Sequence, residues 1–456
     1  MSETILGISA YYHDSAAVLL IDGKIIGAVQ EERFSRIKHD ESFPKKAIKY
    51  LLQMAGIDEI DTIAFYEKPY IKFERLLETY HAFAPFGYKS FLSAIPVWIN
   101  EKLFMKKMLK DELGKLGLDL KKINLLFPEH HLSHSASAFY PSPFNEAAIL
   151  TIDGVGEWAT TTIGFGNGND IEILRELHFP HSLGLLYSAF TYYCGFKVNS
   201  GEYKLMGLAP YGNANSDQTK SYKKIILDEL IDIREDGSFL LNMKYFNFAA
   251  GLTMCKNKLW ESLFDIPKRE PETDLSQSYM NMALAIQQVT EDIVLRLAKT
   301  AKTLTKSKNL VMAGGVALNC VANGKLLRKK IFDDIWIQPA SGDAGGALGS
   351  ALAAWHISKG KKRVANNNND IMEGSYLGPE FSTSDIIRSV KKFKAAFKKY
   401  DDFDILCNDI SELLIQGNVI GWFQGRMEYG PRALGNRSIL GNPKSPEMQK
   451  KIKFKN

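Results

Sequence analysis

The chain has 456 residues, of which 45% are hydrophobic, and it carries a formal net charge of +5. This length and composition predict two or three domains with large apolar cores, which excludes a disordered or fibrous protein. The Lys-rich runs alternate with apolar residues, so they indicate solvated helix faces rather than a nucleic-acid surface.

Cysteine usage and apolar patterning bear on the compartment. The four cysteines have no CxxC spacing, which favours reduced thiols over a disulfide scaffold. The N-terminus lacks the basic region and apolar core of a signal peptide, and no apolar run reaches the roughly 18 residues of a membrane span. We expect a cytoplasmic, soluble protein that binds neither nucleic acid nor a membrane.

Two segments repeat one order of strands and turns. Residues 4–32 read as a strand, a polar turn, a strand, the hairpin turn Asp22-Gly23 and a third strand, and residues 147–177 repeat this order about 140 residues later. Such a duplication is typical of the actin-like, RNase H-like ATPase architecture, an α/β fold whose tight turns place backbone N–H groups around an anionic ligand. Two unrelated hairpins would give the same pattern.

The segment between the two copies reads as mostly helical. Apolar residues at helical spacing predict a helix over residues 43–57 that ends at Gly56, and residues 60–68 predict a short strand. Residues 71–122, rich in Phe, Leu and Lys, predict a helical cover rather than a site of chemistry.

Residues 127–144 contain three of the nine histidines within five positions. On a helix, His130 and His134 would lie on one face, one turn apart, where both rings could hold one metal ion, whereas His131 would point elsewhere. By its spacing alone, such a histidine pair is more often two hydrogen-bonded side chains than a metal site. The zinc-protease pattern is excluded because no Glu follows the first histidine. The next apolar strand ends on Asp153, just before a glycine turn.

Two further acids stand at glycine-punctuated positions. In residues 200–212, Glu202 and Lys204 would face the same side of an extended segment and could grip a polar substrate, although a surface ion pair would look the same. In residues 335–355, a strand is followed by a turn with Asp343 and a glycine- and alanine-rich helix. We expect Asp343 to meet the histidine pair across the cleft between the lobes.

A strand that ends in two glycines precedes this segment. Gly314 and Gly315 break the apolar strand, and the helix after them carries Asn319 and Asn323. Glycines at such a junction let a nucleotide approach the backbone, and a helix N-terminus favours negative charge. A two-glycine turn alone is a weak signal.

The polar stretch at residues 358–374, with four consecutive asparagines, predicts a linker. In the segment after it, Arg426, Arg432 and Arg437 lie in a glycine-rich run, where guanidinium groups suit a phosphate ester or anhydride. An exposed basic loop is the alternative.

Six segments resemble, in order and spacing, the O-carbamoyltransferases of the nodulation, cephalosporin and tobramycin type. They are HHLSHSASAFYPSPF, DGVGEW, SGEYKLMGLAPYG, AGGVALNCVANG, PASGDAGGALG and GRMEYGPRALGNRSI. The resemblance implies an actin-like domain over residues 1–357, with lobes of about 1–145 and 146–357, and an α/β (YrdC-like) carbamoyltransferase lobe that begins at 375. This C-terminal lobe resembles the partner protein that makes the activated adenylate.

The resemblance also implies a reaction. Carbamoyl phosphate and ATP, with Mg²⁺ accompanying the nucleotide, would give carbamoyl-adenylate, whose carbamoyl group passes to a hydroxyl of a small acceptor such as a sugar or antibiotic in natural product biosynthesis. A homodimer is compatible with it. Fe(II) or a similar divalent ion suits a mixed imidazole and carboxylate ligand set.

The positions that match the family's motifs are as follows. The metal ligands would be His130, His134, Asp153 and Asp343, and His13 or His39 would accept the proton of the acceptor hydroxyl. The adenylate would be bound by Gly154, Glu202, Lys204, Gly207, Gly314, Gly315, Asn319 and Asn323. Carbamoyl phosphate would be bound by Arg426, Arg432 and Arg437.

One departure from the family pattern concerns the end of the chain. The GPRALGNRSI motif lies near the start of the family's C-terminal lobe, so we expect this lobe to be mostly absent and the chain to be doubtful as an autonomous adenylate-forming enzyme. The alternatives are a nucleotide-binding subunit that needs a partner to supply the missing lobe, and a sugar kinase of the same superfamily, against which the paired histidines argue.

Overall fold

The computed structural model describes residues 2–99, 103–119, 121–365, 368–448 and 451–452. The chain divides into two compact units, residues 1–371 and residues 372–456. Each unit is considered by itself. None of the helices in the described ranges is long and apolar enough to cross a membrane.

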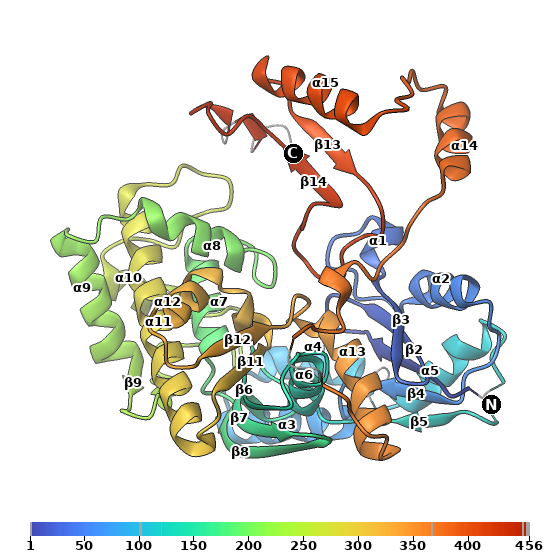
Figure 1. The fold of residues 1–456 in the computed structure, drawn as a ribbon. Coiled ribbons are helices and arrows are strands. Elements are labelled where there is room, and N and C mark those ends of the chain that lie inside the picture. The colour runs from blue at the N-terminus through green and yellow to red at the C-terminus, as the bar shows by residue number, and fades with distance from the viewer. Residues whose placement is uncertain (1, 100–102, 120, 366–367, 449–450, 453–456) are drawn as a thin grey trace. The chain divides into compact units, whose positions relative to one another are not determined.

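Unit 1 contains two five-stranded sheets with the same topology (Figure 1). In each sheet, three strands form antiparallel hairpins, and two later strands add in parallel beside the first of them. The orders are β3-β2-β1-β4-β5 and β8-β7-β6-β11-β12. The duplicated actin-like lobes predicted from residues 4–32 and 147–177 are therefore confirmed.

The strands have the following bounds. The first sheet comprises β1 (Thr4–Ser9), β2 (Ala16–Ile21), β3 (Lys24–Gln30), β4 (Thr62–Phe65) and β5 (Asn124–Leu126); the second comprises β6 (Glu146–Ile152), β7 (Ala159–Asn167), β8 (Asp170–His178), β11 (Asn309–Ala313) and β12 (Asp334–Ile337); β9 (Ile231–Ile233) and β10 (Phe239–Leu241) pair separately.

Local sequence explains the hairpin between β2 and β3. Asp22 and Gly23 have φ values of 50° and 79°, as a two-residue turn with both central residues in the left-handed region requires. The turn pairs Ile21 with Lys24. The prediction of an Asp-Gly hairpin is thus confirmed.

The helices of unit 1 cover both sheets. They are α1 (Glu32–Ser35), α2 (Lys45–Ala55), α3 (Pro69–Phe83), α4 (Tyr88–Val97), α5 (Met105–Gly114), α6 (His130–Phe139), α7 (Leu183–Tyr193), α8 (Glu202–Leu208), α9 (Asp217–Ile225), α10 (Asn257–Phe264), α11 (Gln277–Thr305), α12 (Cys320–Arg328) and α13 (Asp343–Ala353), with short 3-10 or π segments η2 (Ala209–Tyr211), η3 (Ile226–Leu230), η4 (Gly315–Leu318) and η5 (Ala354–Ser358). As predicted, α2 ends at Gly56, which has φ 66° and ψ 33°.

The last helix of each lobe packs on the sheet of the other lobe. Helix α6 follows the strands of the first sheet but packs on β6, β7 and β11, whereas α13 follows the second sheet but packs on β1, β2 and β4. The two helices lie against each other between the sheets (Figure 1). A Cβ atom on Gly349 of α13 would come within 1.7 Å of the carbonyl oxygen of Ser133 on α6, so only glycine permits this approach.

The described residues of unit 2 include a two-stranded antiparallel sheet and helices. Its elements are η6 (Glu373–Ser375), α14 (Thr383–Phe393), α15 (Phe403–Ile415), β13 (Ile420–Phe423) and β14 (Arg437–Leu440). The loop from β13 to β14 carries Arg426 and Arg432, the third predicted arginine, Arg437, begins β14, and the buried carboxylate of Glu428 organises the loop. Oε1 of Glu428 accepts hydrogen bonds from the backbone N–H groups of Leu434, Asn436 and Arg437 at 2.7, 2.9 and 3.2 Å.

The contact between α6 and α13 gives a stability prediction. We expect Gly349→Ala to destabilise the protein by about 1–3 kcal/mol or more, because the new methyl group must push two buried backbones apart. The midpoint of thermal unfolding measures this. Gly207→Ala is the matched control in helix α8, where an added Cβ has nothing within 4 Å. An equal midpoint for both variants would contradict the packing.

Candidate functional site

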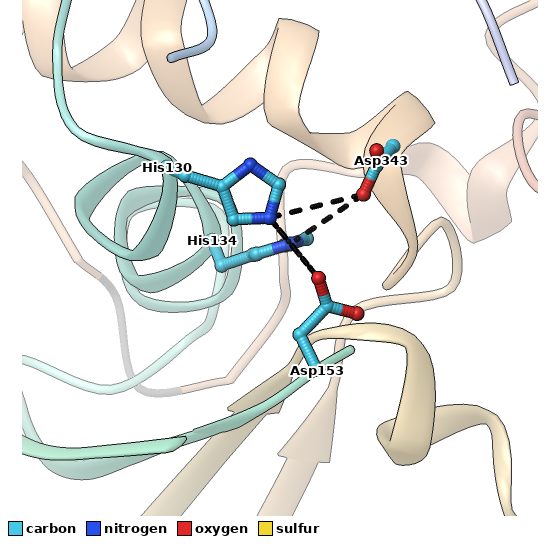
Figure 2. A group of neighbouring side chains, drawn as sticks. All are labelled: His130, His134, Asp153 and Asp343. Atoms are coloured by element: carbon cyan, nitrogen blue, oxygen red, sulfur yellow. Dashed lines mark hydrogen bonds and ion pairs between the residues drawn. The ribbon is translucent and has the colours of Figure 1, made fainter. Parts of the chain in front are cut away.

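Four side chains from separate parts of the sequence converge between the lobes (Figure 2). His130 and His134 lie on the first two turns of α6, Asp153 directly follows β6, and Asp343 is the first residue of α13. One ligand atom of each residue lies within 4.8 Å of the others. The structure thus brings together the four residues that the sequence suggested as metal ligands.

The distances suit a single ion. Nε2 of His130 lies 3.1 Å from Nε2 of His134 and 3.1 Å from Oδ2 of Asp153, and the two Nε2 atoms lie 3.8 and 3.9 Å from Oδ1 of Asp343. Two nitrogens that each bind one ion at about 2.1 Å would stand roughly 3 Å apart. The other oxygen of Asp343, Oδ2, is buried without a hydrogen bond. The donor set and its spacing therefore fit a divalent metal.

The charges of the cluster depend on one another. Burial disfavours the imidazolium form of His130, but the hydrogen bond to Asp153 and the charge of Asp343 outweigh it and raise its pKa to about 9. Burial also raises the pKa of Asp153, yet the hydrogen bonds to His130 and His134 hold it well below its usual range. A divalent cation bound by these side chains would compete with the proton on His130.

The two glycines after β11 make close contacts within the protein itself. The N–H of Gly315 donates to Oδ1 of Asp153 at 2.8 Å, which leaves Oδ2 directed at the histidines. Gly314 has φ 89°, and a Cβ there would lie 2.3 Å from the carbonyl oxygen of Ile152. These two glycines set the position of Asp153; their predicted contact with a nucleotide stays a prediction.

The asparagines of the predicted nucleotide site also have protein partners. The amide of Asn319 makes two 3.0 Å hydrogen bonds with the amide of Gln287, and its Oδ1 accepts from the N–H of Ala322 at the start of α12. Asn323 donates to the carbonyl of Ala317 at 2.7 Å, whereas its buried Oδ1 has no hydrogen-bond partner. Of the two, only Asn323 retains an uncommitted side-chain acceptor.

The prediction of an extended segment at Glu202 and Lys204 is wrong. These residues lie in the first turn of α8, where positions two apart do not share a face. The carboxylate of Glu202 accepts from the backbone N–H groups of Asn199 and Gly201, at 3.0 and 3.1 Å, and so organises the start of the helix. Lys204 and Gly207 are exposed on α8.

Of the two predicted proton acceptors, His13 lies beside the cluster. Its Nε2 is 3.7 Å from Oδ2 of Asp343, whereas the ring of His39 is joined to that of His13 through the carboxylate of Asp14. Gly154, at the turn after Asp153, has its carbonyl bound by the hydroxyl of Ser182 at 2.6 Å.

The arginines of unit 2 differ in their surroundings. The guanidinium of Arg437 donates to four backbone carbonyls, those of Gln424, Asn436, Pro379 and Gly425, and that of Arg426 donates to the carbonyls of Leu377 and Gly378. Arg432 is exposed. Two of the three predicted phosphate ligands therefore hold backbone in this structure, and their role with carbamoyl phosphate stays a prediction.

Sequence reasoning missed the acids that support the cluster. The buried carboxylate of Glu157 accepts from the N–H of His130 at 3.0 Å and from that of Lys68 at 2.7 Å, which joins the starts of α6 and α3 to the turn after Asp153. Glu67, paired with buried Lys72 at 2.6 Å, lies 3.8 Å from Nδ1 of His130. The only available signal for Glu157 was its place in the DGVGEW motif.

The duplicated lobes define the class: an α/β protein of the actin-like ATPase type. Residues 4–352 match the family model described as carbamoyltransferase N-terminus, and residues 411–455 match that of the carbamoyltransferase C-terminus. The chain belongs to the carbamoyltransferase family. Because both models match, the expectation that the C-terminal lobe is mostly absent is not supported.

Individual proteins show the extent of the similarity. An uncharacterized protein of Synechocystis sp. is 57% identical, with 99% of this chain and 73% of the relative covered. Nodulation protein NolNO of Sinorhizobium fredii is 35% identical, with 96% and 59% covered. Among solved structures, component A of (R)-2-hydroxyglutaryl-CoA dehydratase of Acidaminococcus fermentans aligns at 16% identity and a TM-score of 0.36, covering 77% of this chain and 96% of the other.

The hydrogen bonds of Glu157 yield a prediction about cation binding. We expect Glu157→Ala to weaken Co²⁺ binding by about 10-fold or more, because removal of groups that hold a ligand typically costs 10- to 100-fold in affinity. Calorimetric titration with Co²⁺ measures this. The matched control is Glu129→Ala, which removes an exposed carboxylate that makes no capping bond to α6. Equal affinities in the two variants would contradict the role of Glu157.

Proposed function

We propose that this chain is a metal-dependent O-carbamoyltransferase that acts through carbamoyl-adenylate, made from carbamoyl phosphate and ATP, on a hydroxyl of a small-molecule acceptor. The observation that carries the proposal is the convergence of two imidazoles and two carboxylates in the cleft of a chain whose residues 4–352 match the family.

The residues that would hold the ion are His130, His134, Asp153 and Asp343. The mixed nitrogen and oxygen donors favour Fe(II) or a similar divalent metal. When bound, such an ion supplies Lewis-acid polarisation of a carbonyl or phosphoryl oxygen. The chain's own contribution is to hold Asp153 through the N–H of Gly315 and the start of α6, which carries His130, through the carboxylate of Glu157.

The second half-reaction would be an acyl transfer. The acceptor oxygen attacks the carbamoyl carbon, the bond from that carbon to the phosphate oxygen breaks, and AMP leaves. The acceptor's proton passes to an imidazole, for which His13 and His39 are the candidates. The adenylate would lie along Gly154, the glycine pair after β11 and Asn323, whose Oδ1 is uncommitted.

The first half-reaction would use the arginines of unit 2. Guanidinium groups bind phosphate through paired N–H donors, and Arg432 is exposed on a loop that Glu428 and Arg437 organise. We propose that Arg432, with Arg426 and Arg437, binds carbamoyl phosphate while water cleaves it to carbamate and inorganic phosphate. An oxygen of the carbamate then attacks the α-phosphorus of ATP, the bond from that phosphorus to the bridging oxygen breaks, and pyrophosphate leaves as carbamoyl-adenylate forms.

The test is the release of pyrophosphate and AMP from ATP that depends on carbamoyl phosphate, with water in place of the acceptor hydroxyl and the protein loaded with Fe(II). We expect Asp343→Ala and His134→Ala to lose bound metal and AMP release together, by about 100-fold or more in rate, because each removes a buried ligand. Elemental analysis of each variant gives the metal content. The matched control is His178→Ala, which removes an exposed histidine.

Three outcomes would count against the proposal. Full AMP release from metal-free protein would remove the role of the ion. Tight binding of ATP without any turnover would favour a nucleotide-binding subunit. ADP formed with a sugar, rather than AMP formed with carbamoyl phosphate, would favour a sugar kinase.

A further inference from the structure

The geometry points to Asp14 as a positioning residue that orients the ring of His13, with His39 acting only through Asp14 rather than on substrate. This inference rests on the proposed carbamoyl transfer, for which His13 and His39 are the two candidate proton acceptors. It separates the two histidines, which the sequence left equivalent.

Asp14 joins the two rings directly. Its Oδ2 lies 3.0 Å from Nδ1 of His13, and its Oδ1 lies 2.8 Å from Nδ1 of His39. Burial raises the pKa of Asp14, but the hydrogen bonds to both histidines outweigh it and hold the pKa well below its usual range. An ionised carboxylate only accepts hydrogen bonds, so each ring donates to Asp14 through Nδ1, which fixes the direction in which its Nε2 edge points.

The backbone at this place is held in an unusual conformation. Asp14 and His39 have φ values of 53° and 57°, in the left-handed region that non-glycine residues rarely adopt. Backbone hydrogen bonds fasten the two loops together: the N–H of Ser15 donates to the carbonyl of Asp40 at 2.9 Å, and that of Tyr11 donates to the carbonyl of Glu41 at 2.8 Å. The backbone conformation of both loops therefore fixes Asp14 in its position between the two rings.

The outer ends of the two rings face different surroundings. Nε2 of His13 lies 3.7 Å from Oδ2 of Asp343 and so faces the cluster between the lobes. Nε2 of His39 is buried and has no hydrogen-bond partner among the described residues, and the backbone N–H of His39 donates to Oε2 of Glu32 at 2.9 Å. His13 therefore lies at the site, whereas His39 lies on the far side of Asp14 and holds the Asp14 carboxylate by a second hydrogen bond.

The discriminating experiment uses two replacements of His39. The amide N–H of asparagine can take the place of Nδ1–H, so His39→Asn keeps the bond to Asp14 but has no atom at Nε2, whereas His39→Ala loses both. With carbamoyl phosphate and ATP as substrates and water in place of the acceptor hydroxyl, we expect His39→Asn to restore most of the kcat for AMP release that His39→Ala loses. We expect His39→Ala and Asp14→Ala to lower kcat by about 10- to 100-fold with little change in KM for ATP, because a ring misplaced by about 1 Å costs 10²-fold.

The contradicting result is a loss of kcat in His39→Asn as large as in His39→Ala, because Nε2 of His39 would then be needed itself. Melting temperatures identify a variant that fails to fold, and the exposed-surface variant His81→Ala is the control.

A second readout does not depend on activity. Low-field proton NMR of the full chain should show hydrogen-bonded imidazole N–H resonances that disappear in Asp14→Ala and survive in His81→Ala. If the wild-type chain has no transfer activity, the proposed function fails while these resonances still test the bridge. If the resonances are unchanged in Asp14→Ala, the positioning role fails even where transfer is intact.

Discussion

The site depends on the close approach of α6 and α13, two helices that each belong to one lobe by sequence and to the other by packing. Gly349 faces the Ser133 carbonyl, where a methyl group would come within 1.7 Å. This contact fixes the two helix N-termini relative to each other, and those termini carry His130 and Asp343. The ligand geometry is thus a consequence of backbone packing one to two turns away. Because the partial positive charge of a helix N-terminus favours an acid, Asp343 is also well placed electrostatically.

Burying this many charged groups would be costly without dedicated partners. Each supporting acid has one. Asp153 accepts from the N–H of Gly315, Glu157 from the N–H of His130, and Asp14 from two imidazoles, while Glu67 pairs with Lys72. These bonds leave each reacting side chain a single orientation, so the site is arranged before any ligand binds. Such preorganisation reduces the reorganisation that accompanies binding and reaction.

How far the sequence predicted this arrangement depends on the kind of signal. The spacing of His130 and His134 placed both rings on one helix face, and the duplicated strand order correctly predicted the two lobes; the pairing of Asp343 with the histidines came largely from the family resemblance. The sequence did not show partners that are distant along the chain. The extended segment predicted at Glu202 and Lys204 is a helix, and Glu202 accepts from an N–H group just before it. Gly315, Asn319 and Arg437 bond to segments far along the chain or to carbonyls that no motif identifies, while their predicted roles with ligands stay predictions. Hydrogen-bonding side chains take the partners that tertiary structure brings, and a single sequence does not contain that information.

The ligand set has a further consequence for the two lobes. His130 and His134 follow the strands of the first sheet, whereas Asp153 and Asp343 belong to the second by sequence. An ion held by all four would therefore link the lobes as well as the substrate. An ion that binds the folded form and not the unfolded form stabilises the protein in proportion to the logarithm of the ion concentration divided by Kd. The same four bonds would therefore couple metal occupancy, lobe closure and the placement of His13 beside Asp343. Catalytic geometry and interlobe stability would then have one physical origin.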